Sequence, residues 1–573
     1  MRKHRALQKI CGRILAVLLS IALLGGCVGM AADDPLAPFA DNHVELGLKD
    51  ADPAFFPGYV HYKPAGFFRK CNKMVKLAQS GREAKAFALY DELYAEAVYA
   101  LDLSYTADLA FSEDVQNTYF REELAYIETA ALDVTDAFKT ACHKLCESAC
   151  AASFKEHINS DFIYESYADY AAVSPALKAL LARETELEQE YNLVNDSLDL
   201  YNIDWSTDEP KIANKKLGEV FLKLVSVRKQ IAVQSGYPDF AAYMDDTRFM
   251  RDYTEEDLLP LKETVKAYGA LLDYYSWFFS DYAMEERIEV ESLFDNVGSI
   301  LSDISDRADE SYTLLRENNL VSMGYESSRA DFSATYKFPS TNGAAIEGKF
   351  YEDSEFYAYS TFAHEMGHFT YCSSVPNSNP LFCEDGCMDV NELHSNFLEI
   401  LFAIRADKLY PLPEAFQGYE IANQARSVLD GCIYDDWQRA IYQSETDMTL
   451  DEINALYKDI CLAYGLEEYD GMEYDWMYIS HNFTEPMYYI SYATSAFAAL
   501  ELWTLAQKNY DKAVKIWEKA LTVDANEIGY LEALETIGLP FFGETDVAWD
   551  TLDEVSDGLD VLEAAVCAQE EAA

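Results

Sequence analysis

The chain has 573 residues, and its 100 acidic side chains against 44 basic ones give a formal net charge of −56. A field of this sign repels phosphate groups, which excludes nucleic acid and anionic membrane surfaces as partners. Solubility through self-repulsion is the simplest interpretation of the charge, and attraction of cationic peptides is a second one. The length predicts more than one lobe.

The N-terminus predicts export. Residues 1–5 are basic, and residues 14–24 form an apolar stretch that is too short for a membrane span. The stretch ends in Leu24-Gly25-Gly26-Cys27, which resembles the cleavage box of bacterial lipoproteins. This resemblance implies a signal peptide over 1–27 and a lipid on Cys27 that anchors the mature chain to the cell membrane, facing outside the cytoplasm. An ordinary signal peptide with an incidental cysteine is the alternative.

Two largely helical regions follow a short tether. Residues 28–61 are rich in Asp, Pro, Gly and Ala and suit a tether. Long amphipathic patterns with little strand signal predict an N-terminal helical lobe over 62–330 and a second region over 331–573. The candidate helices are 82–104, 112–150, 174–196, 209–235 and 254–283 in the first region, and 391–408, 414–443, 450–464 and 486–521 in the second.

The second region begins with a predicted β-hairpin. Residues 333–338 and 344–350 read as strands, and the turn at 339–343 joins them. A helix is expected next, because Asp353 and Ser354 can cap its start and the pair Val375-Pro376 can end it. A strand edge beside that helix would let an extended peptide pair with it.

This helix carries the pattern H-E-x-x-H at His364, Glu365 and His368. Two histidines four positions apart lie on one helical face, and neutral imidazole is a good zinc ligand. The adjacent Glu365 is placed to take a proton from a metal-activated water as general base. The alternative is a surface helix with two unrelated histidines.

A third metal ligand is expected from a separate segment, because a catalytic zinc has three protein ligands and one open position. Residues 389–402 read as an amphipathic helix on which Glu392, Ser395 and Glu399 share one face. We expect Glu392 to be the ligand, with Glu399 and Ser395 orienting the ligands. His394 is the competing ligand, although it points away from Glu392 on a helical wheel.

The spacing from H-E-x-x-H to E-x-x-S-x-x-x-E at Glu392 resembles the thimet oligopeptidase and oligoendopeptidase F family of zinc peptidases. A second block, at 481–494, resembles the family's segment with a histidine and tyrosines, and 236–243 is a weaker match. The resemblance covers most of the chain after about residue 60. Three features depart from the family. The tyrosine-rich stretch lies one residue farther from His481, and Ile490 stands where a tyrosine is often found. The strand before the H-E-x-x-H helix also lacks the usual Pro-Tyr pair.

The resemblance implies a mainly α fold. We expect a two-lobed helical ellipsoid whose halves flank a deep channel, with one Zn²⁺ at its floor and a small β-hairpin or sheet beside the zinc helix. Such a channel admits short unfolded peptides and excludes folded proteins. The implied activity is that of a zinc metalloendopeptidase. We also expect the chain to be a monomer.

The second block is suited to stabilising the charge that develops on a peptide carbonyl during hydrolysis. An imidazole N–H from His481 and a phenolic O–H from Tyr488 or Tyr492 are suitable donors. Tyr488 and Tyr492 face together on a helix, and Tyr489 with Tyr492 does nearly the same. Packing is the alternative, because the chain has 41 tyrosines.

The cysteines carry less information. Cys142, Cys146 and Cys150 are spaced by four on an expected helix, which predicts a buried stripe, because neighbours at this spacing are poorly placed for a disulfide. Export permits a disulfide of Cys383 with Cys387, or of either with Cys372. A reducing habitat would leave these thiols free.

Two other classes of function remain open. One is a zinc carboxypeptidase or dipeptidase on a similar helical scaffold. The other is a non-catalytic lipoprotein that binds peptides. The glutamate between the two histidines argues against a pure binding protein, because binding has no need of a base.

Overall fold

The chain is mainly helical with one small three-stranded sheet, which confirms the expected fold class. Within the described residues, no helix combines the length and apolarity needed to cross a bilayer. The expected signal peptide with Cys27, and the tether as far as residue 47, lie outside these residues. The computed structural model describes residues 48–170, 174–198, 200, 203–282, 287–330, 332–351, 355–375, 380–382, 386–410 and 412–572.

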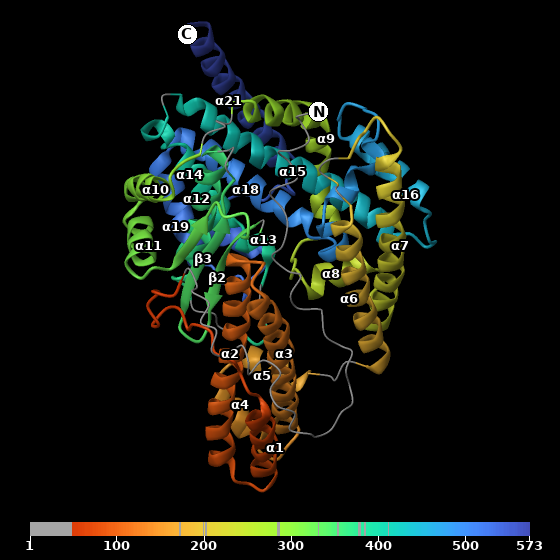
Figure 1. The fold of residues 1–573 in the computed structure, drawn as a ribbon, viewed down its shortest axis with the longest axis vertical. Coiled ribbons are helices and arrows are strands. Elements are labelled where there is room, and N and C mark those ends of the chain that lie inside the picture. Colours follow the sequence, from red (N-terminus) through yellow and green to blue (C-terminus); the bar gives the residue numbers. More distant parts are fainter. Residues whose placement is uncertain are drawn as a thin grey trace.

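A smaller lobe lies at one end of the molecule, below the main body in Figure 1. Its core is rich in aromatic rings, among them Phe67, Phe138 and Tyr167. Residues 48–61 also belong to the folded chain, because Leu48 and Phe56 are buried against the main body. The lobe consists of α1 (Ala65–Gln79), α2 (Glu83–Glu113), α3 (Thr118–Cys146), α4 (Ala151–Ile158) and α5 (Asp161–Ala168).

The smaller lobe contacts two parts of the chain that flank the metal helix. Tyr336, on the second strand of the sheet, donates a hydrogen bond of 2.9 Å to Asp108 of α2. Leu381 and Phe382, which follow the metal helix, pack into the lobe's core, and Phe382 meets Tyr167 edge-on at 5.0 Å between ring centroids. The lobe is thereby joined to the surroundings of the metal helix.

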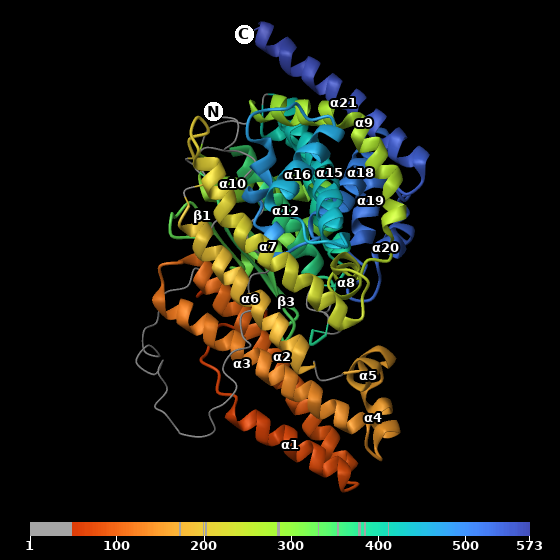
Figure 2. The same ribbon diagram turned by 90° about the vertical axis from the view of Figure 1, so that its right-hand side faces the viewer.

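In the described part of the chain six α-helices come next, and the first two of them, α6 and α7, lie side by side along one side of the body (Figure 2). These helices share one hydrophobic core with the helices that follow the sheet. By this criterion residues 174–330 belong to the main body, although the sequence pattern predicted a boundary at residue 330. These elements are α6 (Pro175–Asp196), α7 (Glu209–Ser235), α8 (Phe240–Thr247), α9 (Glu255–Ser280), α10 (Val290–Ile304) and α11 (Asp306–Glu317).

The sheet has the strand order β1-β3-β2, with bounds β1 (Val321–Gly324), β2 (Ser333–Phe338) and β3 (Gly343–Lys349). β2 and β3 form the predicted antiparallel hairpin, with Ser333 opposite Gly348. β1 was not predicted. It has only four residues, and it pairs in parallel with β3, so that no local turn marks it.

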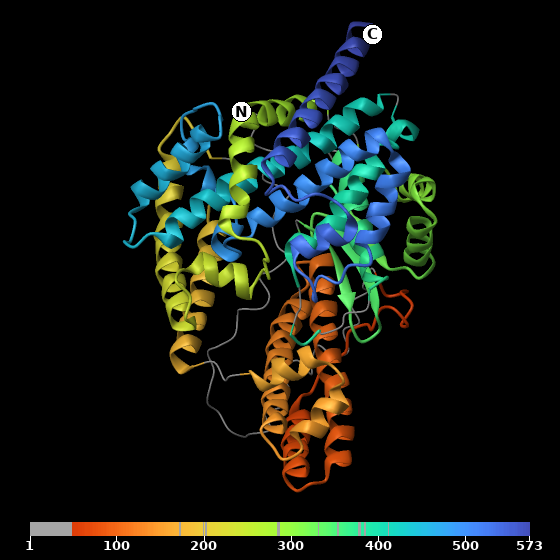
Figure 3. The same cartoon turned by 180° about the vertical axis from the view of Figure 1, so that it is seen from behind.

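The remaining helices complete the body (Figure 1). The helix expected over 389–402 is two helices that meet at Glu392, and the one expected over 486–521 is broken at Asn509. α21 ends the chain and projects from the body (Figure 3). The elements are α12 (Glu355–Cys372), α13 (Met388–Asn391), α14 (Leu393–Ala403), η3 (Ala406–Lys408), α15 (Pro413–Gln443), α16 (Leu450–Ala463), η4 (Met472–Tyr478), α17 (His481–Thr484), α18 (Tyr489–Lys508), α19 (Tyr510–Ala520), α20 (Tyr530–Ile537) and α21 (Thr545–Ala572).

The metal helix α12 and helix α14 approach each other closely at Gly367. A Cβ atom at this position would lie 2.5 Å from the Cα of Ser395 and 2.8 Å from the carbonyl oxygen of His394. Both are backbone atoms and cannot rotate away. Glycine is therefore required here to bring the two helices together.

We expect Gly367→Ala to lower the free energy of unfolding by about 1–3 kcal/mol, because the added methyl group must push α14 away from α12. Chemical denaturation followed by circular dichroism measures the change. Gly66→Ala in α1 is the matched control, since its Cβ would meet no atom within 4 Å. Equal denaturation midpoints for the two variants would contradict the close contact.

Candidate metal centre

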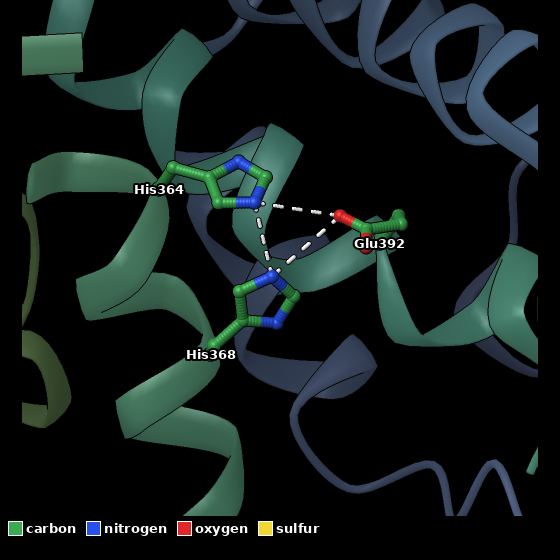
Figure 4. Close-up of side chains that lie close together, drawn as sticks. All are labelled: His364, His368 and Glu392. Carbon is green, nitrogen blue, oxygen red and sulfur yellow. Dashed lines mark hydrogen bonds and ion pairs between the residues drawn. The ribbon is translucent and has the colours of Figure 1, made fainter. Parts of the chain in front are cut away.

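The two histidines of H-E-x-x-H project from one face of α12 (Figure 4). Their positions, four residues apart, bring the Nε2 atoms of His364 and His368 to 3.0 Å from each other. Glu392 reaches them from the junction of α13 and α14, with its Oε2 3.4 Å from Nε2 of His364 and 3.5 Å from Nε2 of His368.

These separations fit a tetrahedral metal ion. Bonds of about 2.0–2.1 Å at a tetrahedral angle place ligand atoms about 3.3 Å apart. Among the described residues, this is the one group of His, Cys, Asp or Glu side chains whose donor atoms all lie close enough together to share an ion. The structure thus brings together the three side chains that the sequence predicted as metal ligands.

Glu399 contacts the side of His364 that faces away from the other candidate ligands, as its position in the sequence predicted. Its Oε1 lies 2.5 Å from Nδ1 of the imidazole, while Gln424 donates to its Oε2 at 3.3 Å. Burial by itself lowers the pKa of His364, but Glu399, together with Glu392 and Glu365, outweighs burial and raises this pKa to about 10. The hydrogen bond also orients the ring so that Nε2 faces the other ligands.

His394 supports the other imidazole rather than joining the ligand group. Its Nε2 lies 3.1 Å from Nδ1 of His368, and its ring stacks on Tyr371. Burial and the neighbouring His368 lower the pKa of His394 well below the usual value, so its ring is neutral. The geometry therefore does not favour His394 as a metal ligand, which was the alternative prediction. The contact through which His394 orients His368 was not predicted from the sequence.

Ser395 contacts Glu392, the third candidate ligand. Its hydroxyl lies 3.2 Å from Oε2 of Glu392 and 3.0 Å from the Glu392 carbonyl oxygen. Burial would raise the pKa of Glu392, but His368 and His364 lower it to about 2. The side chain is thus a carboxylate, the form that binds a cation.

Glu365 lies buried beside the group, 4% exposed. Thr335 of β2 donates a 2.7 Å hydrogen bond to its Oε2 and a 3.0 Å bond to its backbone carbonyl. Burial raises the pKa of Glu365 against the opposing effect of His368 and His364. Thr335 was not singled out in the sequence, because a threonine in a strand gives no sign of what it faces.

His481, Tyr488 and Tyr492 form one aromatic cluster. The ring of Tyr488 is parallel to that of His481 at 5.4 Å, and Tyr492 meets Tyr488 edge-on at 4.7 Å. Tyr489 meets His481 edge-on and packs against Tyr434. Burial lowers the pKa of His481 to about 4, so its imidazole is neutral near pH 7.

Contacts from other helices hold this cluster in place. Arg228 of α7 donates a 2.5 Å hydrogen bond to the carbonyl oxygen of Phe483, two residues after His481. Asn396 of α14 donates to Ser495 of α18 at 3.2 Å, which joins the helix after Glu392 to the helix that carries Tyr492. The roles predicted for His481, Tyr488 and Tyr492 stay predictions.

The cysteines near the site are free thiols where the structure describes them. Cys372 and Cys387 make no disulfide, while Cys383 lies outside the described residues. Cys142, Cys146 and Cys150 are also free, and the first and last of them are buried.

We expect the affinity of the metal-free protein for Zn²⁺ to rise between about pH 7 and 9, by about tenfold per pH unit. The ion must displace the proton that Glu399 holds on His364, and this proton is lost only as the pH approaches the raised pKa. Titration against a competing chelator at several pH values measures the slope.

Glu399→Gln should flatten this slope and weaken Zn²⁺ binding by about 10- to 100-fold, because it removes the negative charge and leaves a weaker, neutral acceptor for the imidazole N–H. Glu501→Gln is the control, since Glu501 is a buried glutamate that makes none of the contacts described for the ligand group. A wild-type affinity that does not change with pH would contradict the assignment.

No family model matches the sequence, and the comparison with curated proteins finds no match. Solved structures do match. PZ peptidase A with an inhibitor has a TM-score of 0.69 at 15% identity, over 88% of this chain and 98% of that one. Oligoendopeptidase F from Enterococcus faecium has 0.53 at 11% identity, over 87% and 98%. Trypanosoma cruzi metallocarboxypeptidase 1 has 0.51 at 13% identity, over 82% and 99%. The chain therefore has the oligoendopeptidase F-like fold that its sequence motifs predicted.

Proposed function

We propose that the chain is a zinc-dependent endopeptidase that hydrolyses short unfolded peptides. The observation that carries this proposal is the spacing of the donor atoms of His364, His368 and Glu392, with the carboxylate of Glu365 beside them on α12. When bound, Zn²⁺ supplies a Lewis acid that polarises a carbonyl group and makes water more acidic. The likeness in fold to PZ peptidase A and oligoendopeptidase F supports the same class of reaction.

Glu365 is the proposed general base. A buried carboxylate with a raised pKa takes protons more readily than an ordinary one. It accepts the proton of the attacking water and passes it to the nitrogen of the leaving amine. The hydrogen bond from Thr335 limits the directions in which Glu365 can point.

The edge of the sheet is the proposed docking site for the peptide backbone. β2 is an outer strand of the sheet, and its Thr335 contacts Glu365 directly. An extended peptide that adds to β2 as a further strand would bring its backbone alongside α12. His481, as a neutral imidazole, with Tyr488 or Tyr492, would donate hydrogen bonds to the carbonyl oxygen as it gains charge.

A zinc carboxypeptidase is the second candidate, because the fold also resembles Trypanosoma cruzi metallocarboxypeptidase 1. That resemblance is weaker than the one to PZ peptidase A, with TM-scores of 0.51 against 0.69. The E-x-x-S-x-x-x-E pattern that starts at Glu392 also favours the endopeptidase.

We further propose that the chain is exported and anchored by a lipid on Cys27, with its catalytic part facing outside the cytoplasm. The basic start, the apolar stretch and Leu24-Gly25-Gly26-Cys27 support this proposal. It would place short extracytoplasmic peptides within reach of the enzyme.

Glu365→Gln should lower kcat by about 10²- to 10⁴-fold, because the amide accepts no proton. The Zn²⁺ content should stay at one ion per chain, since Glu365 is not a ligand. Cleavage of a fluorogenic peptide and metal analysis of the same preparation measure the two quantities. A variant with near wild-type turnover would rule out Glu365 as the base.

Peptides blocked at both ends separate the two candidate functions. We expect cleavage within an N-acetylated, C-amidated peptide, because an endopeptidase needs no free carboxylate. Mass spectrometry of the products, with and without a chelator, identifies the cleaved bond. Release of single C-terminal residues, from unblocked peptides alone, would favour the carboxypeptidase.

A further inference from the structure

A fully buried carboxylate lies three residues before the ligand Glu392 and has no part in the chemistry described above. It belongs to Asp389 in α13, which is 0% exposed. Its Oδ1 accepts hydrogen bonds from Tyr253 at 2.7 Å and Thr494 at 2.5 Å, and its Oδ2 accepts one from Ser491 at 2.9 Å. Since Ser491 and Thr494 are on α18, Asp389 joins the turn that carries Glu392 to the helix that carries Tyr492.

A fully buried arginine side chain from an earlier part of the chain contacts both Asp389 and α18. Arg251 follows α8, and its Nε lies 3.6 Å from Oδ2 of Asp389. Its Nη2 donates to the hydroxyl of Ser491 and to the carbonyl oxygen of Met487, both at 2.8 Å. Its Nη1 donates to Asp245 of α8 at 2.5 Å. Two carboxylates thus compensate the buried positive charge, and Ser491 bridges Arg251 to Asp389.

Arg251 donates to the carbonyl oxygen of Met487, and this methionine has an uncommon backbone conformation. Met487 has φ 67°, in the left-handed region that a side chain disfavours. Its N–H donates to the side chain of Gln438, so both of its backbone polar groups are held by side chains. Such conformations persist where the surroundings fix them, and here the next residue is Tyr488.

We infer that Arg251 and Asp389 are positioning residues that fix the segment His481–Tyr492 relative to Glu392. The inference rests on the proposed function, because it gives the pair the task of holding the hydrogen-bond donors at a set position relative to the metal ligands. Neither side chain is assigned a contact with substrate. The pair acts through Met487, Ser491 and the turn before Glu392.

A positioning role and a purely structural role predict different effects of a substitution on stability and on kcat. Loss of packing alone lowers stability and leaves the rate per folded molecule as it was. A shift of the donors weakens contacts made in the transition state, so kcat falls while KM stays nearly constant. A phosphinic peptide, whose tetrahedral anionic group mimics that state, should lose affinity by the same factor as kcat/KM.

The test compares Arg251→Lys and Ser491→Ala with the wild-type chain, all loaded with Zn²⁺. Lysine keeps the charge but cannot bind Met487, Ser491 and Asp245 together. We expect kcat to fall by about 10- to 100-fold in Arg251→Lys, the loss that a displacement near 1 Å can cause. In Ser491→Ala, which removes one hydroxyl, we expect about a threefold to tenfold loss. KM and the Zn²⁺ content should stay close to wild type.

Arg426→Lys is the matched control. Arg426 is largely buried on α15 and binds Asp430 of its own helix and Asp273 of α9, so the substitution disturbs a buried ion pair elsewhere in the body. It should retain wild-type kcat. If Arg251→Lys fails to fold, the kcat of Ser491→Ala tests the positioning role by itself.

Full kcat in Arg251→Lys and Ser491→Ala, or a fall in kcat explained by lost Zn²⁺, would overturn the positioning role while the wild-type enzyme remained active. A wild-type chain that cleaves no peptide with Zn²⁺ bound would instead refute the proposed function and this inference with it.

Discussion

The close contact between α12 and α14 is the constraint on which the candidate site depends. Gly367 lets the backbone of α12 meet that of Ser395, and this brings Glu392 within 3.5 Å of both imidazoles. Donor atoms at such distances repel one another, or share a proton, unless a cation lies between them. The packing of two helices thus produces an arrangement of donors suited to a metal ion.

The electrostatics around the two histidines follow from the same packing. Glu365, Glu392 and Glu399 are all buried next to them, and Glu420 lies beyond Glu399 with a pKa raised by burial and by that neighbour. Several buried carboxylates in a region of low dielectric constant favour a positive charge between them. Because the carboxylates raise the pKa of His364, a proton on this imidazole is favoured in the absence of metal, and a divalent ion can replace it.

The site is also assembled from both halves of the chain. Arg228 and Arg251 precede the sheet in the sequence, yet they hold the backbone around His481 and Tyr488. The smaller lobe contacts β2, whose Thr335 contacts Glu365. The residues that would perform the chemistry lie on α12, at the junction of α13 and α14, on α17 and at the start of α18. Their relative positions depend on contacts made by much earlier parts of the chain.

The sequence predicted most where local interactions decide the structure. α6, α7 and α9 lie within a few residues of their expected bounds, because Ser174 caps the first, Gly236 ends the second in the left-handed conformation, and Thr254 with Asp257 forms a capping box on the third. The hairpin of β2 and β3 has a turn of its own and was found, whereas β1 depends on a distant parallel partner and was not. The break at Glu392 also escaped notice, since the apolar pattern continues across it.

By itself, the sequence determined the ligand candidates His364, His368 and Glu392 and the base candidate Glu365, because the geometry of a helix relates the residues of each motif to one another. Only the tertiary structure decided that His394 supports His368, that Thr335 holds Glu365, and that Arg251 and Asp389 join the two parts of the site. These contacts link segments far apart in the chain, and their partners are chosen by packing, which no local pattern encodes.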